Sequence, residues 1–275
     1  MCNFVVGSRE GSDSCAGNAG HARRAVPAGK CLEKMQRIRG IVLRTVKVGD
    51  SSLVVDLFTE QHGRMSFVAH VSSSGRRRSS GAAFWRPLNM VEFDAEVHGQ
   101  GRLPHVRGVR LTENYADLPY QPVKQMLAMF LAEFLSRVLR GETADGPLYD
   151  YLTTSLRWLD TARESYANFH VVFLLRLSQF VGIWPNIEEQ SSGRCFDLRS
   201  GTFVSAPPMH RDFLSPDEAR LLPLLMRMNY ATMHLFRFTR EQRRRVLQVL
   251  LDFYRLHLPS VGELRSVDVL RDTLD

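Results

Sequence analysis

Residues 37–48 read RIRGIVLRTVKV, and the runs SLVVDLFTE (52–60), HGRMSFVAHV (62–71), FWRPLNMVEFDAEV (84–97) and HVRGVRL (105–111) follow. Apolar and polar residues alternate along much of these runs, which is typical of half-buried strands. Gly49-Asp50 and His62-Gly63 separate the first three runs at the spacing of hairpin turns, where a positive φ is often required. The stretch therefore predicts strands that close into a small β-barrel.

Five short strands with one long polar loop among them favour a barrel of the oligonucleotide-binding (OB) type. The loop, SSSGRRRSSGAA at 72–83, has no apolar side chain larger than alanine, and it carries Arg76, Arg77 and Arg78. It is either a solvated hairpin loop or a loop that closes over nucleic acid, because guanidinium groups bind phosphate well. Phe84 and Trp85 follow it, either as base-stacking residues or as buried strand residues.

The basic charge is concentrated in the predicted barrel. The 275-residue chain has a net charge of +7, and residues 35–114 hold 12 basic against 7 acidic residues, whereas residues 115–275 hold 19 of each. Only four of the 36 basic residues are lysine, and arginine suits bidentate phosphate contacts. The charge favours a nucleic-acid partner for the barrel. The candidate DNA-binding residues are Arg44, Lys47, Arg64, Arg76, Arg77, Arg78, Arg86, Arg107 and Arg110.

The chain divides where its composition and period change. Residues 1–34 are rich in Gly, Ala and Ser, which predicts a disordered leader; it is either the result of a start codon upstream of Met35 or a functional tail. The barrel is expected over 35–114, and the prolines of LPYQP at 118–122 mark its end. An all-α domain follows in two parts, 118–185 and 213–275, and a small hairpin insertion at 186–212 interrupts it. The predicted fold class is α+β and multidomain.

Helical periodicity and capping signals place the helices. One helix ends at Gly141, a second begins at Pro147, and a third over 166–181 is apolar nearly all round, which predicts a central position. Capping boxes begin further helices at Ser215 and at Thr239, and a short one spans 264–274. Cys195–Leu198 and Thr202–Val204 predict a hairpin around Arg199-Ser200-Gly201.

Motifs of catalysis, cofactor binding and export are absent. The chain has no Walker loop, no dinucleotide-binding glycine turn, no His-Glu-x-x-His and no Gly-x-Ser-x-Gly, and its nine histidines are scattered. No apolar run reaches the length of a membrane span, and no signal peptide precedes the barrel. The four cysteines, Cys2, Cys15, Cys31 and Cys195, match no zinc or disulfide spacing. We expect a non-enzyme with reduced cytosolic thiols and neither cofactor, metal nor membrane.

A second basic cluster, Arg243-Arg244-Arg245, lies in the first turns of a predicted helix. Cations there oppose the helix dipole, so the cluster is either a solvated face or a contact for phosphate or an acidic partner.

The residues quoted above resemble the RecO family of recombination mediators. The motifs are GIVL (40–43), VGDSSLVVDLFT (48–59), Gly63-Arg64, SGRRR (74–78), FYRLHL (253–258) and LRSVDVL (264–270). Each motif is weak alone, but together they cover 35–275 in the family's domain order. Many members carry two Cys-x-x-Cys pairs in the insertion, and here only Cys195 remains, so we expect a degenerate zinc-finger-like region without zinc. Asp50 stands where the family usually has glutamate.

The resemblance implies a DNA repair factor that binds single- and double-stranded DNA and anneals complementary strands. It implies a cytoplasmic, nucleoid-associated protein that loads recombinase together with RecR and that binds the acidic tail of single-strand DNA-binding protein. We expect the helix that begins at Thr239 to bind that tail. The binding residues are Arg240, Arg243, Arg244 and Leu247, and Phe236 and Phe238 are either pocket walls or core residues. Arg137 and Arg140 beside Leu135 and Leu139 are the other candidate site. The alternative function is a protein–protein adaptor with incidental basic charge.

Overall fold

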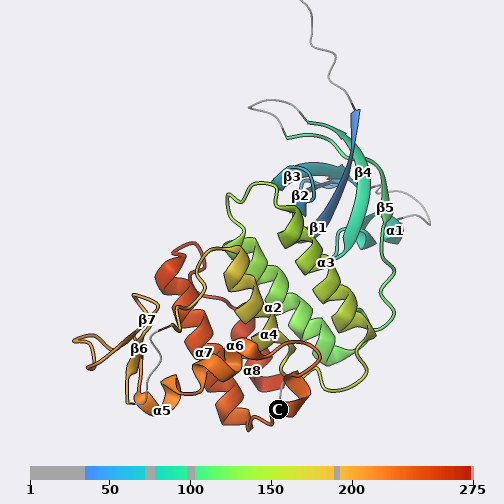
Figure 1. The fold of residues 1–275 in the computed structure, drawn as a ribbon. Coiled ribbons are helices and arrows are strands. Elements are labelled where there is room, and N and C mark those ends of the chain that lie inside the picture. The colour runs from blue at the N-terminus through green and yellow to red at the C-terminus, as the bar shows by residue number, and fades with distance from the viewer. Residues whose placement is uncertain (1–34, 72–77, 98–102, 189–192, 274–275) are drawn as a thin grey trace, which may run out of the picture. The chain divides into compact units, whose positions relative to one another are not determined.

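The computed structural model describes residues 35–71, 78–97, 103–188 and 193–273, without the side chains of 78–80 and 271–273 (Figure 1). A β region comes first and a helical region follows, so the predicted α+β class is confirmed. Within these residues no helix is both long and apolar enough to cross a lipid bilayer.

The β region is a five-stranded sheet that curls onto itself. Its strands are β1 (Met35–Val48), β2 (Ser52–Thr59), β3 (Gly63–His70), β4 (Met90–Glu96) and β5 (Arg107–Leu111), in the order β3-β2-β1-β4-β5. The segment before β5 meets the opposite edge of the sheet, because Val68 and His105 form a parallel bridge. There the Val68 N–H donates to the Pro104 carbonyl, and the Val106 N–H donates to the Val68 carbonyl, each at 2.9 Å. This pairing gives the OB-like barrel that the sequence predicts.

Alternate residues of the strands fill the barrel, as the period of the sequence predicts. Val55 and Leu57 on β2, Phe67 on β3 and Phe93 on β4 are buried in one cluster, and the rings of Phe67 and Phe93 lie edge to face at 4.9 Å. Trp85 belongs to the same cluster, with its ring centroid 6.1 Å from that of Phe93. Of the two roles open to Trp85, the structure therefore selects the buried one.

The polar loop is shorter than the sequence suggests. Residues 78–83 form a short helix, α1 (Arg78–Ala83), so the expectation of a loop up to Ala83 was wrong. The Asn89 amide donates to the carbonyls of Ala83 and Phe84, at 2.9 and 3.1 Å, and so satisfies backbone acceptors that a helix end leaves open. Arg76 and Arg77 lie outside the described residues.

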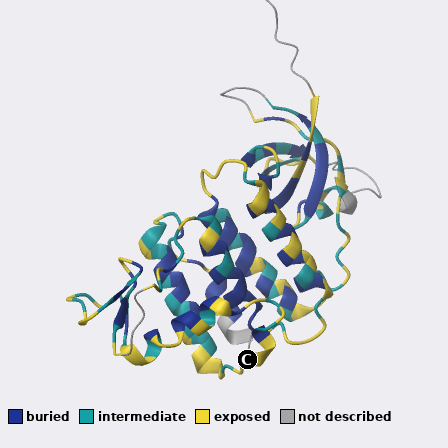
Figure 2. Ribbon diagram, viewed as in Figure 1, coloured by how far each residue is buried: buried dark blue, intermediate teal, exposed yellow. Residues whose placement is uncertain are grey.

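The helical region surrounds one central helix. Its longer helices are α2 (Pro122–Val138), α3 (Gly146–Thr161), α4 (Phe169–Phe180), α7 (Arg240–His257) and α8 (Ser266–Thr273). Nine of the twelve residues of α4 are buried, which confirms that the helix with no polar face is central. Figure 2 shows the buried residues gathered in the interior of this bundle.

A small three-stranded sheet lies between α4 and α7 in the chain. Strands β6 (Cys195–Asp197) and β7 (Thr202–Val204) form the hairpin, and β8 (Phe213–Leu214) pairs with β6. Cys195 is buried, and among the described residues no three His, Cys, Asp or Glu side chains are grouped as metal ligands.

Three short helical segments connect β8 to α7. They are α5 (Pro216–Ala219), α6 (Leu222–Arg227) and the 3₁₀ helix η1 (Met233–Leu235). The capping box of Ser215 and Glu218 is present, but α5 ends after one turn. Pro223 has no N–H to donate to the Ala219 carbonyl, which favours the break between α5 and α6.

The turn between β2 and β3 packs directly on the helical region. Gly63 has φ +66°, and a Cβ there would lie 2.4 Å from the Glu142 carbonyl oxygen. The Arg64 N–H donates to that same oxygen at 3.0 Å. On β1 and β2, Ile41 and Phe58 join the core of the helices. Only glycine allows the turn to approach so closely.

Candidate nucleic-acid interface

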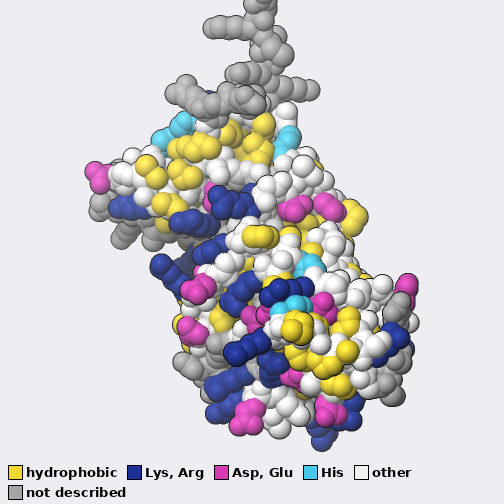
Figure 3. Space-filling view, turned by 90° about the vertical axis from the view of Figure 1, so that its left-hand side faces the viewer, with side chains coloured by type: hydrophobic (Ala, Val, Ile, Leu, Met, Phe, Trp, Pro, Cys, Tyr) yellow, Lys and Arg dark blue, Asp and Glu magenta, His cyan; other side chains and the backbone are white. Residues whose placement is uncertain are grey.

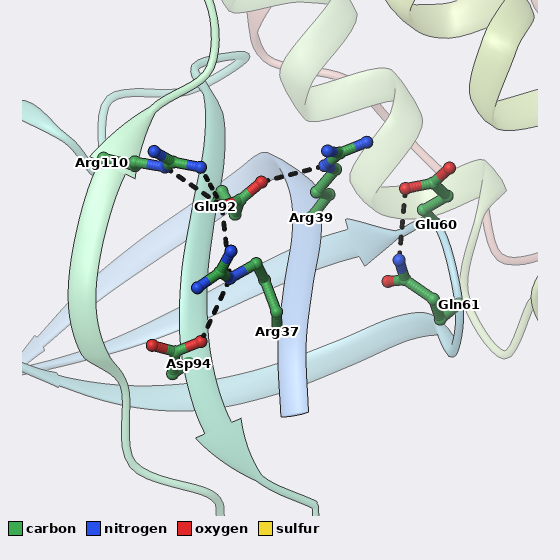
Figure 4. Close-up of polar contacts among 7 residues, drawn as sticks. All are labelled: Arg37, Arg39, Glu60, Gln61, Glu92, Asp94 and Arg110. Carbon is green, nitrogen blue, oxygen red and sulfur yellow. Dashed lines mark hydrogen bonds and ion pairs between the residues drawn. The ribbon is translucent and has the colours of Figure 1, made fainter. Parts of the chain in front are cut away.

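Three arginines surround a buried carboxylate on the outer face of β1, β4 and β5 (Figure 4). Glu92 has only 4% of its side chain exposed, and Arg39 donates to it through Nε at 3.0 Å. Arg110 donates through Nε at 3.1 Å, and Arg37 lies 3.6 Å away. The hydrogen bonds from Arg39 and Arg110 lower the pKa of the Glu92 carboxyl below its ordinary value.

This arrangement gives one of the predicted DNA-binding arginines a partner within the protein. Arg110 is a predicted DNA-binding residue, and its guanidinium is held by Glu92. Arg37 also lies 3.6 Å from Asp94. Arg37 and Arg39 were missed as members of a site, although their alternate spacing on one predicted strand could have indicated a shared face.

Arg64 lies at the junction between the barrel and α2. One of its Nη atoms donates to the Ser136 carbonyl of α2, and the other lies 3.4 Å from Asp56. Its side chain is mostly buried. The structure therefore engages Arg64 inside the protein, not on a surface that phosphate can reach.

The remaining described cations of the barrel are exposed, and none of them forms an ion pair with another described residue; they are Arg44, Lys47, Arg86 and Arg107. The structure does not bring them onto one face. Arg44 pairs in register with Asp56, whereas Lys47 pairs with Leu53, whose side chain packs against the barrel interior. Arg44 and Lys47 therefore extend from opposite faces of β1.

An apolar cavity of about 400 Å³ opens beside the first turns of α7. Phe236 and Phe238, which the sequence leaves as pocket walls or core residues, line it together with Val246 and Leu250 of α7 and also pack against the helical core. Leucines of α6 and the residue before it complete the lining: Leu221, Leu222, Leu224 and Leu225. Arg245 lies at the cavity and donates through Nε to Glu218 at 2.8 Å.

The predicted tail-binding residues do not all face this cavity. Leu247 is buried in the core of the helical region and is not available to a partner. Arg243 donates through Nε to the Asn168 side-chain oxygen at 3.1 Å. Arg240, Arg243 and Arg244 all have interactions within the chain, and Arg245, which the prediction left out, is the arginine of this cluster that lines the cavity.

The other candidate for an acidic tail, at the end of α2, offers no apolar surface. Leu135 and Leu139 are fully buried in the helical core, and Arg137 pairs with Glu133 at 3.7 Å. Figure 3 shows one face of the molecule, on which Lys and Arg side chains are spread over both the barrel and the helical region. They are mixed with Asp and Glu side chains and lie beside a group of hydrophobic side chains. Of the two candidate sites, the one at α7 is therefore the one with an apolar cavity.

Comparison with known proteins shows two family matches that together cover most of the chain. Residues 35–115 match the family described as Recombination protein O N terminal, and residues 119–266 match Recombination protein O C terminal. The chain is similar to DNA repair protein RecO of Phocaeicola vulgatus, with 45% identity over 86% of this chain and 98% of that protein. It is 42% identical to RecO of Bacteroides fragilis over 88% of this chain and 100% of that protein. For RecO of Porphyromonas gingivalis the identity is 35%, over 86% and 98% respectively.

Proposed function

Because the chain belongs to the RecO family of DNA repair proteins, we propose that it acts as a recombination mediator. In this role it binds single- and double-stranded DNA, anneals complementary strands and, together with RecR, loads recombinase onto DNA covered by single-strand DNA-binding protein. It works without catalysis of its own, in the cytoplasm at the nucleoid. Residues 35–114 form the DNA-binding domain of this proposal, and the helices of 118–185 and 213–275 form the domain for the acidic tail.

The observation that carries the DNA-binding role is the uneven charge on an OB-like barrel. Residues 35–114 hold an excess of five basic residues, and the helical part of the chain is neutral. Four exposed cations, Arg44, Lys47, Arg86 and Arg107, remain on the barrel without an ion pair to a described residue. Phosphates supply the counter-charge that these side chains lack, and such binding weakens steeply as salt displaces the protein.

The cavity at α7 supports the role of the helical region. An acidic tail with an apolar end needs an apolar cavity for that end and cations for its carboxylates. Phe236, Phe238 and Leu250 supply the first, and Arg245 supplies the second by exchanging its partner Glu218 for a carboxylate of the tail. The N-terminus of α7, which begins at Arg240, adds a positive end of a helix dipole.

A salt titration tests the proposed function. The affinity for a labelled single-stranded oligonucleotide is measured by fluorescence anisotropy at two salt concentrations, and strand annealing is followed with complementary labelled strands. We expect the logarithm of the association constant to fall linearly with the logarithm of the salt concentration, with a slope of about −0.7 per phosphate contact. An adaptor that binds only proteins would show neither salt-dependent DNA binding nor annealing.

A further inference from the structure

The outer face of β1, β2 and β3 is divided into a covered half and an uncovered half. At one end Ile41 and Phe58, which pair in register, are buried against the helices. Arg64, Asp56 and Ser66 form a polar border, in which the Ser66 hydroxyl donates to Asp56 at 2.5 Å. Beyond this border the same face continues, and its side chains are exposed or half-buried.

The strand register shows which side chains share the uncovered half. Val46 pairs with Val54, Val54 with Val68, and Val68 with His105. In the next row Val48 pairs with Ser52, and Ser52 pairs with His70. Directly paired residues extend from the same face of a sheet, so these side chains form one surface. We call it the valine–imidazole face: Val46, Val48, Ser52, Val54, Val68, His70 and His105.

This face is both apolar and open to solvent. Val46 is 39% exposed and Val48 is 52% exposed, although valine usually lies inside a barrel or against a neighbouring layer. Arg44 lies two residues before Val46 on the same strand, so its exposed guanidinium borders the face. The surface therefore combines apolar side chains with an adjacent cation.

The two histidines add a flat π-surface at the edge of the face. The rings of His70 and His105 are stacked, with centroids 5.3 Å apart and planes inclined by 14°. Ser52 Oγ lies 3.2 Å from His70 Nδ1 and helps to hold that ring in place. Both histidines are exposed and come from segments that are 35 residues apart, so only closure of the barrel brings them together.

We propose that the valine–imidazole face binds the unpaired bases of single-stranded DNA and gives the barrel a preference for single strands over duplex. The inference rests on the proposed DNA-binding function and extends it. Bases of a duplex are stacked on one another and offer mainly phosphates, whereas a single strand offers the faces of its bases to apolar and aromatic side chains. A base stacks on the outward ring face of the imidazole pair, the valines contact neighbouring bases, and Arg44 binds the phosphate between them.

The test compares a single strand with the duplex formed from the same sequence. The full chain carries His70→Ala together with His105→Ala, and anisotropy measures its binding to each labelled ligand. Loss of a stacking platform weakens single-strand binding about 5- to 30-fold. Duplex binding should stay within about twofold of wild type, because phosphate contacts are kept. His234→Ala, an exposed histidine of η1, is the matched control and should change neither affinity.

Two further variants separate base stacking from hydrogen bonding by the imidazole nitrogens. His70→Phe with His105→Phe keeps a π-face without those nitrogens and should retain single-strand affinity within about threefold. Val46→Ser, at an exposed position, should also reduce single-strand binding selectively. Circular dichroism and melting temperature confirm the fold of each variant.

Each remaining outcome overturns the inference. Unchanged single-strand affinity in a folded double alanine variant does so, and so does equal loss for the single strand and the duplex. A phenylalanine variant as weak as the alanine variant shows that stacking is not the cause. If the double alanine variant loses binding to RecR or to the tail peptide but keeps its DNA binding, the valine–imidazole face is a protein contact instead. A wild-type chain that binds no DNA would instead refute the proposed function itself.

Discussion

Glu133 on α2 holds the beginning of α8 through Ser266, since the two residues share two hydrogen bonds. The Ser266 N–H donates to Glu133 Oε2 at 2.9 Å, and the Ser266 hydroxyl donates to the same oxygen at 2.6 Å. The Arg265 N–H donates to Oε1 at 3.1 Å. A carboxylate on one helix thus satisfies backbone donors at the start of another, which are otherwise unpaired at a helix N-terminus.

Glu133→Gln should destabilise the helical region. Burial raises the pKa of Glu133, but the hydrogen bonds from Ser266 and Arg265 and the nearby Arg137 outweigh it and lower the pKa below its ordinary value. A carboxyl whose pKa is lowered in the folded state stabilises that state at pH values above its ordinary, unfolded pKa. This contribution is lost as the pH falls through the folded pKa. The substitution should cost about 1–2 kcal/mol in urea unfolding at neutral pH. The difference from wild type should shrink under acid conditions. Glu263→Gln, at an exposed position, should be neutral.

Gly63→Ala should disrupt the contact between the barrel and the helices. Its φ of +66° is strained for alanine, and the new Cβ would meet the backbone of Glu142, Thr143 and Ala144. Gly49 is the matched control, because its φ is +72° and a Cβ there would meet nothing within 4 Å. We expect about 1 kcal/mol of destabilisation for Gly49→Ala and at least about 2 kcal/mol more for Gly63→Ala. Equal melting temperatures for the two variants would contradict the close approach.

Leu224→Asp should weaken binding of the acidic tail. Leu224 is 53% exposed and lines the cavity at α7, so a carboxylate there removes apolar contact and repels an acidic ligand. Calorimetry with a peptide of the tail of single-strand DNA-binding protein should show a loss of about tenfold or more. Annealing of naked DNA should be unchanged. Leu256→Asp provides the control, since Leu256 is 38% exposed on α7 and does not line the cavity. A wild-type affinity in the Leu224 variant would place the tail elsewhere.

The arginines of SGRRR at 74–78 should contribute to the salt dependence of DNA binding. Replacing Arg76, Arg77 and Arg78 with alanine removes up to three phosphate contacts and should flatten the logarithmic salt slope for a single strand by about 0.7 per contact. The fold should persist, because the segment contains no large apolar side chain. An unaltered slope in a folded triple variant would exclude these arginines from the DNA contact.

The barrel, the central helix and the capping boxes could be predicted because local patterns determine them. Alternation of period two indicates a strand before its partner is known, and the boxes at Ser215 and Thr239 satisfy backbone groups within three residues. The apolar residues of α4 likewise leave no polar face for solvent. The family resemblance was readable for the same reason, since its motifs are short and continuous.

Tertiary structure alone decided which charged and aromatic residues are available to a ligand. Arg64 and Arg110 resemble Arg44 in sequence, but Arg64 is largely buried at α2 and the exposed Arg110 is paired with Glu92, while Arg44 is exposed without an ion pair to a described residue. These outcomes depend on partners many residues away, which no local period reveals. The same holds for Leu247, which faces the core, and for the His70–His105 stack, which exists because a parallel bridge closes the barrel. Periodicity determines which face a side chain occupies, but only the packing of distant segments determines what covers that face.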